Sequence, residues 1–282
     1  MIDLKLGGRP GYFLLKAASV PPSPEGNGGA EEETGAAKLE ADLGREVWKY
    51  VKDRTVVDFG CGFGHEAVAA ALHGATRVYG LEINDDFIGA AQREAEMSSV
   101  ADHCFFLHGE RQAKEVEALN GTVDTVFSLD AFEHFRDPGQ ILTHINKLLK
   151  PGGRLLVNFG PPWNHPYGAH ARYFTRIPWV HLIFSEKTIL KVRALYRDDG
   201  ATRFEEVRGG LNRMTVGRFL SLIKAHDFEV ELLQLRPVKG TGWFVTNNLL
   251  KEYFTSAVIC AAVKKASTGS RIEQSTVRTV NN

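Results

Sequence analysis

The chain has 282 residues, of which 43% are hydrophobic and 24% are charged. These proportions are typical of a folded globular protein and exclude an intrinsically disordered chain. Lysine and arginine together number 34, as do aspartate and glutamate. The formal net charge is therefore zero, and it gives no reason to expect nucleic acid or an anionic membrane as a partner.

The three cysteines, Cys61, Cys104 and Cys260, lie far apart and form no Cys-x-x-Cys pair. The sequence thus indicates neither a zinc site nor a disulfide framework, and it favours a reducing compartment. No apolar run approaches the roughly 20 residues of a membrane span, and the N-terminus lacks the extended apolar core of a secretory signal. We expect a cytoplasmic protein with no metal, no membrane partner and no nucleic-acid partner.

Residues 1–35 are expected to be an N-terminal segment that ends in a loop rich in proline, glycine and glutamate. Because the stretch 21–35 has almost no apolar side chains to bury, we predict that this loop is flexible. The next stretch, 36–53, spaces its apolar residues three or four apart, which predicts one helix before the first strand.

From residue 55 to residue 160, short apolar runs alternate with helical patterns. Asp137 and Pro138 have the residue types that begin a helix. The alternation predicts an α/β fold: a doubly wound, mostly parallel sheet with helices on both faces and ligands at the carboxyl ends of its strands. We expect strands at 55–59, 77–82, 104–109, 123–129 and 154–160, and helices at 65–74, 85–97 and 137–153.

After residue 160 the alternation stops, and residues 161–210 are rich in tryptophan, tyrosine and histidine with interrupting prolines. We interpret them as an aromatic insertion after the fifth strand. A helix at 215–227, strands at 228–238 and 256–265 and a short helix near 247–253 then complete a seven-stranded sheet. The main domain is expected at 36–264, followed by a polar tail at 265–282.

Three glycines, Gly60, Gly62 and Gly64, follow the first predicted strand directly. Glycine at such a turn permits positive φ and leaves no Cβ between the backbone and a ligand. A dinucleotide-binding turn requires Gly-x-Gly-x-x-Gly, but the position three after Gly62 is His65. The spacing therefore disfavours a nicotinamide oxidoreductase.

The stretch VVDFGCGFG resembles the first motif of the class I S-adenosylmethionine-dependent methyltransferases, a strand ending in Asp/Glu-x-Gly-x-Gly-x-Gly. The resemblance continues through Glu82 at the end of the second strand, HGE after the third, DAFEHF after the fourth and LLKPGG before the fifth. It covers about residues 47–160 strongly, and it implies the Rossmann-like fold of that family with S-adenosylmethionine as cofactor.

The resemblance also implies roles for individual residues. Asp58 lies near the ammonium group of the cofactor, and Gly60 and Gly62 lie against its methionine part. Glu82 accepts hydrogen bonds from both ribose hydroxyls, a charge-assisted pair. Ile83 packs on the adenine ring.

Further positions follow from the same comparison. Glu110 stands where the family usually has an aspartate that contacts the adenine amino group; this departure leaves the adjacent Arg111 amide as an alternative contact. Asp130 and Ala131 border the transferred methyl group and the amino group of the cofactor. Cys61, between two of the glycines, is counted with the cofactor-binding residues, although a role as a small space-filling side chain is the alternative.

The acceptor side is less defined. DAFEHF is similar to a sequence motif found in methyltransferases that act on small molecules, so His134 is a candidate substrate contact. The insertion offers Trp163 and Tyr167 as aromatic substrate contacts and His165 and His170 as candidate catalytic bases. The alternative is that the aromatic residues form a small core of the insertion itself.

We therefore expect a methyltransferase that moves a methyl group from S-adenosylmethionine to oxygen, nitrogen or carbon of a small organic acceptor by in-line displacement. Two alternatives stay open. One is a catalytically silent module that binds S-adenosylmethionine for regulation, and the other is a methyltransferase that acts on a protein or a nucleic acid.

Overall fold

The structure is a computed structural model, and it describes residues 5–20, 35–207 and 209–266. The flexible loop predicted at 21–35 and the polar tail predicted at 265–282 lie almost wholly outside these ranges. No helix in the described part of the chain has both the length and the apolar composition that crossing a bilayer requires.

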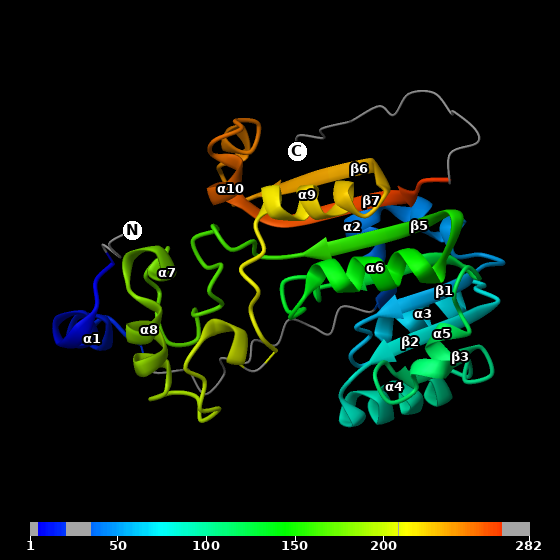
Figure 1. Ribbon diagram of the computed structural model, residues 1–282, viewed down its shortest axis with the longest axis horizontal. Helices are drawn as coiled ribbons and strands as arrows, with labels where there is room; N and C mark the ends of the chain where they lie inside the picture. Colours follow the sequence, from blue (N-terminus) through cyan, green and yellow to red (C-terminus); the bar gives the residue numbers. More distant parts are fainter. Residues whose placement is uncertain (1–4, 21–34, 208, 267–282) are drawn as a thin grey trace.

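Seven strands form one sheet in the order β3-β2-β1-β4-β5-β7-β6 (Figure 1). Strands β1 to β5 are parallel to one another, whereas β7 is antiparallel to both β5 and β6. The predicted seven-stranded, mostly parallel sheet is thus confirmed. The strands are β1 Thr55–Phe59, β2 Arg77–Glu82, β3 Cys104–His108, β4 Val123–Leu129, β5 Leu149–Phe159, β6 Phe228–Pro237 and β7 Thr255–Lys264.

Helices cover both faces of the sheet, as expected for strands that are apolar on both sides. One buried cluster contains Leu39, Ala67 and Ala91 of α2, α3 and α4, and the cluster on the other face contains Leu142 and Phe219 of α6 and α9. The α-helices are α1 Gly8–Ala17, α2 Gly35–Leu43, α3 His65–Leu72, α4 Asp85–Met97, α5 Ala113–Glu117, α6 Pro138–Leu148, α7 Val180–Ile183, α8 Glu186–Arg193, α9 Val216–Ala225 and α10 Lys251–Phe254, and the 3-10 turns are η1 Arg45–Tyr50, η2 Phe204–Glu206 and η3 Gly242–Phe244.

Two helix boundaries differ from the prediction. The stretch 36–53 is not one helix, because Gly44 adopts φ +75° and separates α2 from the 3-10 turn η1. The helix expected to run to residue 153 begins as predicted, with Asp137 accepting hydrogen bonds from the amides of Gly139 and Gln140. It ends at Leu148, where β5 begins.

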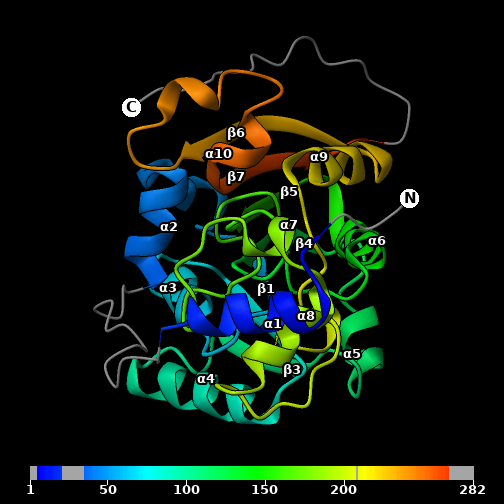
Figure 2. The same ribbon diagram turned by 90° about the vertical axis from the view of Figure 1, so that its left-hand side faces the viewer.

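The insertion has a hydrophobic core of its own, which includes Phe174, Ile189 and Phe204. The N-terminal segment belongs to the same core, because Leu15 of α1 is fully buried in it. The periodicity of the sequence did not lead us to predict α1. Figure 2 shows α1 lying across α8 at the end of the molecule toward which the arrows of the parallel strands point in Figure 1.

Candidate functional site

The three glycines in the turn after β1 differ in their surroundings: Gly60 and Gly64 are packed against other residues, whereas Gly62 is open. All three have positive φ: +83° at Gly60, +49° at Gly62 and +80° at Gly64. A Cβ on Gly64 would lie 2.7 Å from the Cβ of Ala91, and one on Gly60 would lie 3.1 Å from the Cβ of Ala131, but one on Gly62 would meet no atom within 4 Å. Gly62 therefore offers bare backbone to a ligand.

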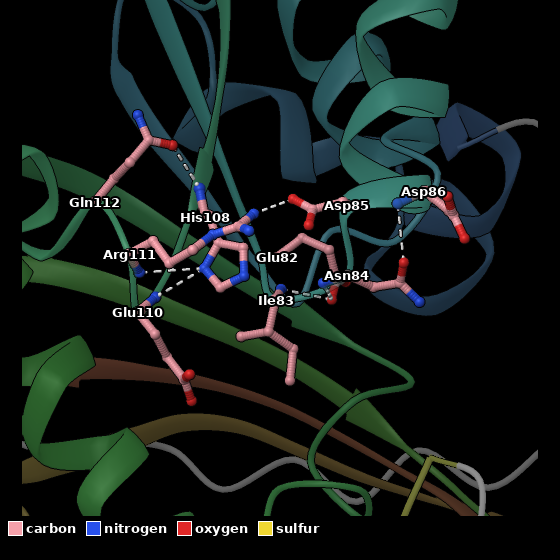
Figure 3. A network of polar contacts seen from close by, with 9 residues as sticks. All are labelled: Glu82, Ile83, Asn84, Asp85, Asp86, His108, Glu110, Arg111 and Gln112. Carbon is pink, nitrogen blue, oxygen red and sulfur yellow. Dashed lines mark hydrogen bonds and ion pairs between the residues drawn. The ribbon is translucent and has the colours of Figure 1, made fainter.

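Glu82, at the end of β2, is held against this turn by backbone amides. Its Oε2 accepts a hydrogen bond of 3.1 Å from the amide of Gly62. Its Oε1 accepts bonds of 2.7 Å from Ile83 and 3.1 Å from Asn84 (Figure 3). A carboxylate has about four lone-pair sites, so three amide bonds fix the group and leave capacity for a further donor such as a ligand hydroxyl.

The adjacent loop after β3 is ordered by a histidine that the sequence analysis did not select. His108 Nδ1 accepts hydrogen bonds from the amides of Glu110 (3.3 Å) and Arg111 (3.2 Å). The Arg111 side chain pairs with Asp85 at the start of α4, while the Glu110 carboxylate points away from that pair (Figure 3). Ile83 remains 65% exposed, so its apolar side chain is available to a planar ring.

Asp58 lies at the bottom of the turn and is 2% exposed, with Oδ2 free of any hydrogen bond to the described residues. Burial, and then the nearby charge of Glu66, raise the pKa of Asp58 well above its usual range, although Lys38 acts in the opposite direction. A buried carboxyl oxygen without a partner is costly, and an ammonium group of a ligand would satisfy it.

Lys38 of α2 links the glycine-turn side to the loop after β4. Its Nζ lies 2.9 Å from Glu66 Oε1 and 2.8 Å from Asp130 Oδ2. Burial lowers the pKa of Lys38, but the two carboxylates outweigh burial and raise that pKa overall. No local motif marks Lys38 as a site residue, since α2 reaches Asp130 only through the tertiary fold.

The loop after β4 presents the other predicted residues. Asp130 adopts φ +49°, which is uncommon for a residue other than glycine, and Ala131 is 9% exposed. Glu133 is 4% exposed; its Oε1 accepts a bond of 3.1 Å from the amide of Gly160, and its Oε2 has no partner among the described residues. Burial raises the pKa of Glu133.

The structure brings two of the predicted histidines together and separates the third. The rings of His134 and His170 meet edge to face, with centroids 5.5 Å apart. His165 Nδ1 instead accepts a 3.0 Å bond from the amide of Tyr167. Burial lowers the pKa of both His165 and His170 to about 4, so both rings are neutral at pH 7.

A cavity of about 540 Å³ lies between the loop after β4 and the insertion. Of the residues proposed from sequence, His134 and His170 line it, whereas His165, Trp163 and Tyr167 lie outside its lining. The Trp163 ring packs instead against other rings of the insertion. The other lining residues are Ala169, Ala171, Tyr173, Phe174, Ile189, Arg193, Arg197, Asp198, Asp199, Phe204, Val207, Gly210 and Leu211.

The part of the chain that the structure describes contains no group of three or more histidine, cysteine, aspartate or glutamate side chains arranged to hold a metal ion.

Taken together, an open α/β sheet with one antiparallel strand, a glycine turn after β1 and an acidic residue ending β2 define the class I, Rossmann-like methyltransferase fold. Residues 57–157 match the family model of the methyltransferase domain. The chain thus contains a class I S-adenosylmethionine-dependent methyltransferase domain.

Individual relatives differ in what they act on. The chain is 26% identical over 125 residues to "O-methyltransferase rstn1" of Aspergillus nomiae, which covers 44% of this chain and 54% of that protein. It is 42% identical over 118 residues to "Ribosomal protein L11 methyltransferase" of Shewanella sediminis, which covers 39% of each chain. The chain thus spans about half or less of the length of these relatives.

A solved structure from Listeria monocytogenes, described as an S-adenosylmethionine dependent methyltransferase, superimposes with a TM-score of 0.54 at 16% identity. The superposition covers 83% of this chain and 99% of that one. At this level of identity, the likeness shows the fold.

Proposed function

We propose that this protein transfers a methyl group from S-adenosylmethionine to a small organic acceptor that binds in the cavity beneath the insertion. The observation that carries the proposal is the position of that cavity. It is lined by His134, four residues after Asp130 in the loop after β4, so it adjoins the edge of the sheet where the open glycine turn lies. The 36–264 domain would contain both sites, with 161–210 as the acceptor-binding insertion.

When bound, S-adenosylmethionine supplies an electrophilic methyl group on a sulfonium sulfur, and its transfer leaves neutral S-adenosylhomocysteine. The residues of the chain bind and orient the reactants, which can contribute several kcal/mol. Asp58 would accept a bond from the ligand's ammonium group, Glu82 from its ribose hydroxyls, and Ile83 would cover its adenine. We further propose contacts from Gly60, Cys61, Gly62, Glu110, Arg111, Asp130 and Ala131.

A concave, partly apolar cavity of this size favours a small acceptor over a protein or a nucleic acid. The alternative of a silent binding module predicts tight cofactor binding without turnover. Incubating the protein with S-adenosylmethionine and a panel of phenols, amines and carbon acids, and measuring S-adenosylhomocysteine, distinguishes the two. Turnover supports the enzyme, and its absence across the panel despite binding supports the module.

The cofactor half of the proposal can be tested with a matched pair of glycine variants. Gly62 and Gly152 both have positive φ and both have open space where a Cβ would be. Gly62→Ala should lower the affinity for S-adenosylmethionine in calorimetry. Gly152→Ala, near the start of β5, should introduce similar backbone strain without changing that affinity. Absence of binding to the folded wild-type protein would overturn the proposed function.

A further inference from the structure

The loop after β4 is held in place by a segment about 80 residues further along the chain. The side-chain amide of Asn212 donates to the carbonyls of Phe132 (2.7 Å) and Phe135 (2.8 Å). Its backbone amide donates to the carbonyl of Glu133 at 2.9 Å. Three bonds from one asparagine thus fix the short loop that contains His134.

Two glycines let the same segment approach the His134 ring. Gly209 and Gly210 have φ +88° and +70°. A Cβ on Gly209 would lie 3.5 Å from His134 Nδ1, and one on Gly210 would lie 3.2 Å from the His134 carbonyl oxygen. The Gly210 carbonyl oxygen lies 2.7 Å from His134 Nδ1.

This contact determines which ring nitrogen bears the proton. A backbone carbonyl only accepts hydrogen bonds, so His134 Nδ1 must be the donor. In the neutral ring, Nε2 then has the lone pair. No hydrogen bond joins Nε2 to another residue in the described ranges, so Nε2 is free to accept a proton from a ligand in the cavity that the ring lines.

The other two candidate bases are less suitable. His165 uses Nδ1 to accept the Tyr167 amide and lies outside the cavity lining. His170 lines the cavity, but its Nε2 is fully buried without a partner. Burial lowers the pKa of His170 to about 4, which makes it a weak base.

We propose that His134 is the general base of the reaction and that the acceptor is a hydroxyl compound whose O–H donates to His134 Nε2. The inference rests on the proposed function and specifies its acceptor. The hydroxyl oxygen forms the new bond to the methyl carbon as the pair of electrons of the broken carbon–sulfur bond stays on sulfur. The hydroxyl proton moves to Nε2, and the imidazolium then releases it to water.

The side chains that line the cavity indicate the chemical character of the acceptor beyond its hydroxyl group. Phe174, Ile189, Phe204 and Leu211 are almost fully buried apolar residues that line it. They suit an apolar or ring-bearing body, so a phenol is the simplest acceptor of this class. The charged and titratable groups around His134 include His170 across the ring contact and Glu133 next to it in the loop. They also include the Tyr173, Arg193, Arg197, Asp198 and Asp199 side chains on the cavity wall.

The tautomer can be tested on the unmodified protein. Long-range proton–nitrogen NMR of the imidazole rings at neutral pH should show His134 with its proton on Nδ1 and an unprotonated Nε2. A ring with the proton on Nε2 would overturn the assignment of the base.

The second test uses 4-nitrophenol, whose phenolate absorbs visible light. Titrated into protein saturated with S-adenosylhomocysteine, it should bind with its apparent pKa lowered by about one unit, because proton transfer to Nε2 leaves the phenolate beside an imidazolium. This shift is a tenfold change in the ratio of ionised to neutral phenol. His134→Gln should abolish this shift, whereas His73→Gln should retain it, since His73 makes the same Nδ1 bond to a carbonyl, that of Ala69, but does not line the cavity.

The outcomes separate the two proposals. Failure to bind S-adenosylhomocysteine overturns the proposed function. If S-adenosylhomocysteine binds but 4-nitrophenol does not, or if His134→Gln keeps the shift, the proposal for His134 and a hydroxyl acceptor is overturned while the methyltransferase function stands. Circular dichroism of both variants verifies their folding.

Discussion

The proposed cofactor side and the proposed acceptor side of this molecule are built in different ways. On the cofactor side, Glu82 binds the amides of Ile83 and Asn84 beside it and of Gly62 in the turn after the neighbouring strand β1. On the acceptor side, His134 bonds to Gly210, 76 residues away, and Asn212 to Phe132, 80 residues away. The first region is made from turns at adjacent strand ends, and the second depends on a distant segment returning to the sheet.

The two regions should differ most in how their stability changes as the pH is lowered. Burial lowers the pKa of His165, His170 and His181 to about 4, below the usual 6.5. Their contribution to stability is therefore complete above pH 6.5 and is lost as the pH falls toward 4, by up to about 3 kcal/mol per ring. Asp58 has the opposite effect on stability. Its pKa is raised in the folded state, so the folded state binds a proton more readily than the unfolded state and is favoured as the pH falls.

Hydrogen exchange at pH 7 and pH 5, corrected for intrinsic rates, should therefore show that peptides of 161–211 lose protection while those of 55–64 keep it. His181→Phe should reduce the loss, since His181 is 1% exposed and already packs against the Trp163 ring. Equal loss in both regions would contradict the proposed difference.

Gly64→Ala should destabilise the cofactor side by about 3 kcal/mol. A left-handed backbone costs an L residue roughly 1–2 kcal/mol, and overpacking against Ala91 adds about as much again. Gly200→Ala is the matched control, since Gly200 has φ +66° with open space around it. Urea unfolding should give a larger loss for Gly64→Ala; equal losses would exclude a packing role for Gly64.

Glu82→Ala should weaken S-adenosylmethionine binding by about 1–3 kcal/mol, the range for losing a charge-assisted hydrogen bond. Glu96→Ala, on the exposed surface of α4, serves as the control. Calorimetry measures both variants. If Glu82→Ala binds as tightly as the wild type, Glu82 is not a ligand of the cofactor.

Lys38→Met should have the smallest effect, about 1 kcal/mol on the free energy of unfolding. Lys38 is only 24% exposed between its two carboxylates, whereas the exposed pair of Lys49 and Glu46 should contribute almost nothing. Urea unfolding of Lys38→Met and of Lys49→Met tests this order. A larger loss for Lys49→Met would show that the Lys38 contacts do not tie α2 to the loop after β4.

Much of the cofactor side could be predicted from the sequence. The order of strands and helices, the Asp137 cap and the turn of three glycines all depend on residues close in the chain, where periodicity and turn chemistry act directly. Even here the roles of the glycines differ, because only the packed structure shows that Gly64 contacts α4 while Gly62 stays open.

The acceptor side was decided by tertiary structure. The sequence indicated an aromatic insertion with several histidines, but His165, Trp163 and Tyr167 lie outside the cavity lining, whereas His134 and His170 are part of it and contact each other. It also did not indicate that α1 shares the core of the insertion. Local patterns specify elements and turns, whereas the choice of which side chains share a cavity depends on contacts between residues many positions apart, and these form only when the whole chain packs.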